Sequence, residues 1–80
     1  MTYLDTLSRG RQAIAKSVEK RSDSDQIAAR MLELGFVLGE PVKVFAVGPL
    51  GGDPMAVFLG SSRFALRRGE ASRIAVHFVP

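Results

Sequence analysis

The chain has 80 residues, no cysteine and a formal net charge of +3, from eleven Lys and Arg against eight Asp and Glu. This length predicts one domain over residues 1–80, and a chain of this size buries only about 60% of the surface that its unfolded form exposes. The lack of cysteine excludes a disulfide framework and a thiolate metal site. No segment nears the roughly 18 consecutive apolar residues of a membrane span, and the N-terminus has no signal-peptide core, so we expect a cytoplasmic protein.

The first elements are short. Leu4 and Leu7 are spaced like a single helical turn, and residues 8–10 (Ser-Arg-Gly) interrupt that pattern before a strand predicted over about residues 12–19. Ile14 and Val18 would share the inner face of this strand. Lys16 lies between them on the same face, which predicts a bulge at that point rather than a buried charge.

A helix is predicted next, from a polar start to a glycine stop. Asp23 can accept a hydrogen bond from a free backbone amide at the helix start, and Gln26 can return one. The helix should end at Gly35, because glycine tolerates the left-handed conformation of a C-terminal cap, and Phe36 can then fold back onto the helix. The apolar stripe of this helix is predicted from its spacing to contain Ile27, Ala28, Met31, Leu32 and Leu34.

A strand rich in β-branched residues follows the turn at Gly39. One face of this strand should carry Val42, Val44 and Ala46, and the other face Lys43, Phe45 and Val47. Residues 48–54 contain too many glycines and prolines for regular structure and predict a loop with Leu50 at its tip. Within it, Gly52, Asp53 and Pro54 form the predicted turn, because a residue before proline adopts an extended conformation suited to re-entering the sheet.

The C-terminal third of the sequence predicts a β-hairpin, a corner and a last strand. Residues 55–59 and 63–67 form a hairpin around a short turn, with Phe64 and Leu66 on the inner face. Residues 69–72 form a corner of about one helical turn. In the last predicted strand, residues 73–79, the inward side chains are Ile74, Val76 and Phe78, and the outward ones are Arg73, Ala75 and His77.

These elements predict a mainly β fold. Five short strands with glycine corners favour a small, partly closed barrel of the SH3-like type, because closure removes the exposed edges of an open sheet. One α-helix should lie between the first two strands, with short helical turns elsewhere.

The order of these motifs resembles the FeoA family. The resemblance depends on residues 30–36 (Arg-Met-Leu-Glu-Leu-Gly-Phe) with Gly39, on residues 52–54 (Gly-Asp-Pro), and on residues 65–71 (Ala-Leu-Arg-Arg-Gly-Glu-Ala). It covers nearly the whole chain. It implies an SH3-like domain that acts as a cytosolic partner of FeoB, the membrane ferrous iron transporter with a GTP-binding soluble region, and that assists or regulates transport.

The candidate contact residues for such a partner are exposed apolar side chains with one arginine. We predict that Leu32, Phe45 and Leu50 form one exposed apolar patch that supplies affinity, and that Arg67 at its edge supplies orientation. No catalytic group is predicted, because the sequence has a single histidine and no cysteine to combine into an acid–base or nucleophilic site. We therefore expect a binding module that is not an enzyme and has no cofactor.

Two other functions remain open from the sequence. His77 is the one candidate ligand for a transition metal, and because one imidazole cannot make a tight site, any such site should be weak or shared between two copies in a weak homo-oligomer. The alternative is a nucleic-acid-binding barrel with a basic rim, although a net charge of +3 is low for that function. The rim would contain Arg63, Arg67, Arg68 and Arg73.

Overall fold

The computed structural model describes residues 1–78, so the part of the last predicted strand at Val79 lies outside the described residues. In chain order the elements are β1 (Thr2–Tyr3), the 3-10 turn η1 (Leu4–Thr6), β2 (Gln12–Val18), α1 (Gln26–Leu34), β3 (Pro41–Gly48), β4 (Gly52–Leu59), β5 (Ser62–Leu66), α2 (Arg68–Ala71) and β6 (Ile74–His77).

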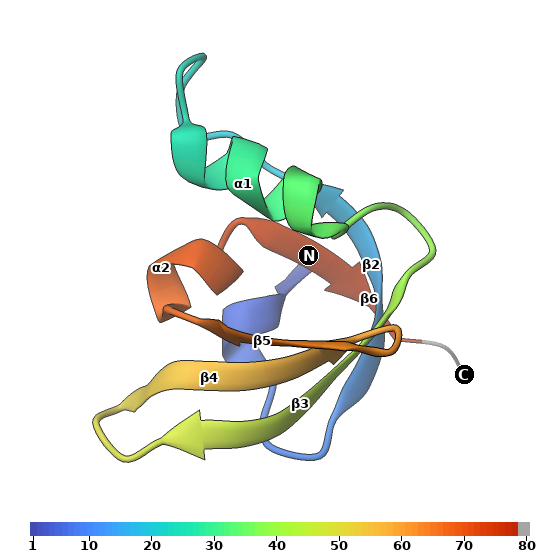
Figure 1. Ribbon diagram of the computed structural model, residues 1–80, viewed down its shortest axis with the longest axis vertical. Coiled ribbons are helices and arrows are strands. Elements are labelled where there is room, and N and C mark those ends of the chain that lie inside the picture. The colour runs from blue at the N-terminus through green and yellow to red at the C-terminus, as the bar shows by residue number, and fades with distance from the viewer. Residues whose placement is uncertain (79–80) are drawn as a thin grey trace.

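These strands form one antiparallel sheet in the order β1-β6-β2-β3-β4-β5. The sheet curls around a core, with α1 lying over one end of the barrel (Figure 1). The mainly β, SH3-like prediction is confirmed. The number of strands was underestimated, because the two residues of β1 are too few to show a period in the sequence. As β1 comes first, α1 lies between the second and third strands rather than between the first two.

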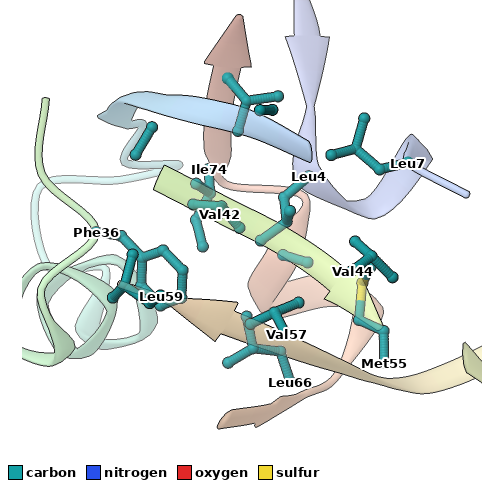
Figure 2. Packing of buried hydrophobic residues seen from close by; sticks show 14 of the residues in the cluster. Leu4, Leu7, Phe36, Val42, Val44, Met55, Val57, Leu59, Leu66 and Ile74 are labelled. Carbon is teal, nitrogen blue, oxygen red and sulfur yellow. The ribbon is translucent and has the colours of Figure 1, made fainter. Parts of the chain in front are cut away.

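The core contains side chains from the turn η1, from the segment after α1 and from several strands (Figure 2). Leu4 from η1, Phe36 after α1, Met55 from β4 and Ile74 from β6 are all fully buried. Burying a side chain of this size stabilises the fold by about 1.5–3 kcal/mol relative to leaving it in water. Among the described residues no polar or charged residue is fully buried. The interior is therefore an apolar packing core without a buried reactive group.

A bulge in β2 reorders the faces of that strand. The register with β6 shifts between Ala15 and Ser17, as Lys16 predicted, and Val18 then packs against the core. Before the bulge, however, the inner positions are Ala13 and Ala15, while Ile14 is only half-buried on the outer face. The prediction of Ile14 as an inner residue was wrong, because the small alanines fill the inner positions of this part of the barrel.

A second bulge, in β3, has a similar effect. Val44 pairs with Val57 and Ala46 pairs with Ala56, so Phe45 is the extra residue. Beyond the bulge the faces are exchanged, since Ala56 lies on the outer side of β4, and Ala46 therefore lies outward. The predicted face of Ala46 was wrong for this reason, because an inserted residue reverses the alternation of a strand.

The helix α1 starts two residues later than predicted. Asp25, not Asp23, is the N-cap, and its carboxylate accepts hydrogen bonds from the amides of Ile27 and Ala28, both at 3.1 Å. Gln26 is already in the helix and returns no bond to the cap. The cap is chosen by a tertiary contact of Asp25, described below, which the local sequence does not show.

The end of α1 agrees with its prediction, whereas its apolar stripe is narrower. Gly35 adopts the left-handed conformation with φ of 112°, and the amide of Phe36 donates to the carbonyl of Met31 at 3.2 Å. Gly39 also has a positive φ, of 95°. Of the predicted stripe, Ala28 and Met31 are buried and Leu34 is partly buried, but Ile27 and Leu32 are exposed.

The β3–β4 turn lies within the predicted loop and is a tight turn from Leu50 to Asp53. The amide of Asp53 donates to the carbonyl of Leu50 at 3.2 Å, and the two residues between them, Gly51 and Gly52, both have a positive φ, of 66° and 80°. Residues 52–54 are also the first residues of β4, where the register with β3 is irregular and the peptide between Asp53 and Pro54 is cis. Gly52 and Asp53 therefore lie in the turn as predicted, whereas Pro54 follows the turn as part of β4.

The C-terminal elements follow their predictions except at two side chains. The β4–β5 hairpin, the buried Leu66 and the short α2 are confirmed. Ala75 was predicted to point outward but is fully buried, between its pairing partners Tyr3 of β1 and Ser17 of β2. Phe78 lies outside the core and is 37% exposed, with the guanidinium of Arg11 at 4.1 Å from the centre of its ring. This cation–π contact replaces core packing for Phe78.

Candidate interaction surface

A groove with a volume of about 460 Å³ lies on the outer face of the barrel. The side chains and backbone that line it come from β2, from β3 and from the β4–β5 hairpin. They are Gln12, Ala13, Ile14, Pro41, Val42, Lys43, Phe58 and Gly60.

Strand pairing explains why these residues meet. Ile14 lies opposite Pro41, and Lys43 lies opposite both Gln12 and Phe58. Residues directly opposite each other in an antiparallel pair share a face of the sheet, so these side chains project together from the outside of the barrel. The groove thus has an apolar floor from Ile14 and Phe58 and one positive charge, on Lys43.

An aromatic pair extends this apolar surface along β3 and β4. The ring centres of Phe45 and Phe58 are 4.4 Å apart, with an angle of 36° between the planes. Both side chains are half-buried. Phe45 was predicted to lie on the outer face, and it does. Its ring packs there against Phe58, a residue that the sequence did not single out.

The other predicted contact residues do not join Phe45 in one patch. Leu32 is 43% exposed on α1, and Leu50 is 83% exposed at the tip of the β3–β4 turn. Figure 1 shows this tip and α1 at opposite ends of the molecule. Arg67 is exposed where β5 leads into α2. A single patch made of all four side chains was therefore wrong, although each side chain remains exposed or half-buried.

The four arginines of the predicted basic rim divide into two kinds. The guanidinium of Arg68 donates to the carbonyl of Asp5 at 2.6 Å, and Arg73 forms an ion pair with Asp25 at 2.7 Å. These two arginines are used inside the molecule. Arg63 and Arg67 are exposed, and neither forms an ion pair with any residue of the described chain. The continuous basic rim expected of a nucleic-acid-binding barrel is therefore absent from the described residues.

Asp25 lies in a cluster of two ion pairs, Asp25 with Arg73 and Glu70 with Arg30, which we call the paired region. The side chains of Asp25 and Arg73 are only 5% and 11% exposed, and the same carboxylate caps α1. The hydrogen bond from Arg73, and then the amide of Arg21, hold the pKa of Asp25 well below its ordinary value of 3.8. The shift has a structural cause, a carboxylate surrounded by donors, and it lies away from the groove.

The predicted metal ligand, His77, is exposed at the end of β6 and pairs with Ile14 of β2, so it lies beside the groove. Within residues 1–78, no three side chains of His, Asp or Glu come together as a metal site. The residues present therefore do not fit a tight metal site within one molecule.

None of the helices in the described part of the chain has the length and apolar character needed to cross a membrane.

Comparison with known proteins identifies the fold family. The family model of the FeoA domain matches residues 2–77, nearly the full chain. The chain belongs to the FeoA family. Members of this family are accessory proteins of iron transport. A comparison with curated proteins gives no match.

Solved structures of FeoA proteins agree with this assignment. FeoA of Stenotrophomonas maltophilia, solved in complex with zinc and described as an SH3-domain protein and a proposed ferrous iron transport activating factor, is 45% identical. The match covers 95% of this chain and 89% of that one, with a TM-score of 0.87. FeoA of Chlorobium tepidum is 33% identical over 99% of this chain and 71% of its own, with a TM-score of 0.82.

A longer relative shows the same domain. Iron(II) transport protein A of Clostridium thermocellum is 32% identical over 98% of this chain, with a TM-score of 0.82. The chain spans only 46% of that protein's length. The FeoA domain described here is thus the shared unit.

The groove is the part of this FeoA surface that sequence reasoning missed. Phe58 and Ile14 look like core residues in the sequence, and only the cross-strand pairs show that both project outward. The available signal was Lys43, which lies on the same face of β3 as Pro41 and cannot face an apolar core without a partner.

Proposed function

We propose that this chain is a cytosolic accessory protein of ferrous iron uptake that binds the membrane transporter FeoB through protein–protein contacts and assists or regulates it. The observation that carries the proposal is the FeoA family match over residues 2–77, together with the 45% identical FeoA structure. The fold supports a binding role, because the core is filled with apolar side chains and a groove lies on the outer face of the barrel.

The groove is the proposed docking surface. Its apolar floor, Ile14 and Phe58, is backed by Phe45, and aromatic and aliphatic anchors in a concave site commonly carry most of the binding energy of an interface. Lys43 supplies one charge that can orient an acidic group of the transporter. Leu50, at the turn tip, remains a second predicted contact.

The proposal is tested by titrating the chain with the cytosolic region of FeoB, without nucleotide and with GDP or a GTP analogue, and then with the full-length transporter. We expect saturable binding in at least one state. Lys43→Glu should weaken it, while Lys20→Glu, the same charge change at an exposed residue outside the groove, should not. Absence of binding in every state and to the full-length transporter would contradict the proposal.

A second candidate function is a metal response shared between copies. The zinc complex of the related FeoA favours it, and His77 is the ligand this chain offers. Two copies could bind one ion through His77 and a carboxylate. Light scattering in the presence of Zn²⁺ or Fe²⁺ tests this. A rise in molar mass that His77→Ala abolishes supports a shared site, and an unchanged mass removes it.

A further inference from the structure

The sheet has two edges, and only one of them is long. The strand order leaves β1 and β5 at the ends, and β1 contains two residues, whereas β5 contains five, Ser62–Leu66. In Figure 1, β5 lies beside β4 and leads into α2. An exposed strand edge offers unpaired backbone groups that can pair with another chain.

The register shows which backbone groups of β5 are free. The two-residue turn Gly60-Ser61 joins Leu59 to Ser62, and Gly60 has φ of 58°, as the first position of a type II′ turn requires. Pairs flanking such a turn exchange hydrogen bonds, and the bonding alternates from there along the strands. The amide and carbonyl groups of Arg63 and Ala65 therefore point away from β4.

Nothing in the described chain uses these groups. No backbone hydrogen bond links Arg63 or Ala65 to an element beyond the sheet, and both residues are exposed. Two donors and two acceptors are thus available along this edge, spaced as a partner strand needs them.

The side chains on this edge indicate the kind of partner. Arg63, Ala65 and Arg67 alternate on one face, and no acidic residue of the described chain forms an ion pair with either arginine. A second copy pairing antiparallel around Ala65 would place Arg63 opposite Arg67, and directly opposed like charges are destabilising. The edge thus disfavours its own copy and favours a strand with acidic residues.

We propose that the outer edge of β5 binds an extended acidic segment of a partner protein by adding it as a further strand to the sheet. Two carboxylates four residues apart, about 13 Å in an extended chain, would face Arg63 and Arg67, and the residue midway between them would face Ala65. The segment pairs with the backbone of Arg63 and Ala65. Arg67 contributes only its side chain, because its amide already donates to Glu70.

The probe is a blocked peptide, acetyl-Thr-Glu-Val-Thr-Val-Glu-Thr-amide, and its control has Lys in place of both Glu. On titration, we expect NMR shifts at residues 62–67 and slower amide exchange at Arg63 and Ala65. The Lys peptide should bind at least about tenfold more weakly. Shifts confined to the groove residues, equal binding of the two peptides, or no binding of the acidic peptide would overturn the proposal.

Two variants separate charge from backbone pairing. Arg63→Glu should weaken the acidic peptide at least about tenfold, while Arg9→Glu, the same charge change at an exposed residue elsewhere, should leave it unchanged. Ala65→Pro keeps the charges and removes one outward donor without touching the β4 ladder, so it should also weaken binding. Unchanged peptide binding by Arg63→Glu, or by a folded Ala65→Pro variant, would contradict strand addition.

This inference depends on the proposed function only for the identity of the partner. The peptide experiment contains no transporter, so it tests the edge alone. If FeoB binds the native chain and Arg63→Glu equally well, the transporter does not use the edge and the proposed function stands. If FeoB binds neither, the proposed function fails, and the peptide result still decides the edge.

Discussion

Two regions of this small barrel use the same kind of side chain in opposite ways. Where α1 meets α2, arginines are paired: Arg73 with Asp25 at 2.7 Å, and Arg30 with Glu70 at 3.0 Å. Along the β5 edge, Arg63 is exposed without an acidic partner in the described chain. An arginine of this chain therefore has a structural role where a folded acceptor lies against it, and is available to a partner protein where no acceptor does.

The largest effect should come from breaking the paired region. Asp25→Ala removes the cap of α1 and leaves Arg73, 11% exposed at its side chain, without its carboxylate. We expect the melting temperature to fall by about 10 °C or more, since losing one partner of a sheltered pair costs more than losing a surface contact. Thermal unfolding followed by circular dichroism measures this.

The matched control is Asp23→Ala, an exposed aspartate two residues earlier. It should leave the melting temperature nearly unchanged. A small loss for Asp25→Ala, or an equal loss for both variants, would show that the paired region does not stabilise the fold as described.

A second break concerns the base of the β3–β4 hairpin. A Cβ atom at Gly48 would overlap with the carbonyl group of Asp53, which is backbone and cannot move aside without disturbing the pairing of the two strands. Gly48→Ala should lower the free energy of unfolding by about 1–3 kcal/mol. Gly69→Ala, where no atom lies within 4 Å of the added carbon, should be close to neutral. Urea unfolding compares the two, and equal losses would contradict the close approach.

The paired region should also respond to acid. Because the pKa of Asp25 is lower in the folded chain than its ordinary value of 3.8, its contribution to stability is fully present above that value and is lost as the pH falls below it. We therefore expect the melting temperature to drop between pH 5 and pH 2. In Asp25→Asn the drop should be smaller. An identical pH dependence in the native chain and this variant would contradict the assignment.

The smallest effect on stability is expected at the exposed surface. Arg63→Glu and Leu50→Ser change side chains that pack against little, so each should alter the free energy of unfolding by less than about 0.5 kcal/mol. Urea unfolding of both variants tests this. A loss above about 2 kcal/mol in either variant would show that the residue stabilises the fold, which would contradict its assignment to a surface left free for a partner.

The fold was largely predictable because local rules decided it. Gly35 ends α1 in the left-handed conformation that glycine tolerates. The β4–β5 hairpin turns at Gly60, between two segments of alternating side chains. The bulge at Lys16 was also predicted, but for a different reason: Lys16 already shares the outer face of Ile14, and the register shift instead turns Val18 inward. These features depend on a few adjacent residues.

The candidate surface was less predictable because it depends on pairing between distant residues. Ile14 and Phe58 reach the outer groove through the registers of two different strand pairs, and the bulge at Phe45 exchanges the faces of β3 beyond it. The choice of Asp25 over Asp23 likewise depends on Arg73, 48 residues away. A single sequence shows periods and caps, but not which residues lie opposite one another.

The most direct test of the account is an NMR titration of the isotope-labelled chain with the cytosolic region of FeoB in its different nucleotide states, repeated with the full-length transporter in nanodiscs. We expect saturable binding, with shift changes on the outer face at Lys43 and Phe58 and with the ion pair between Asp25 and Arg73 kept intact. No binding in any state, or shift changes confined to α1 and α2, would contradict it.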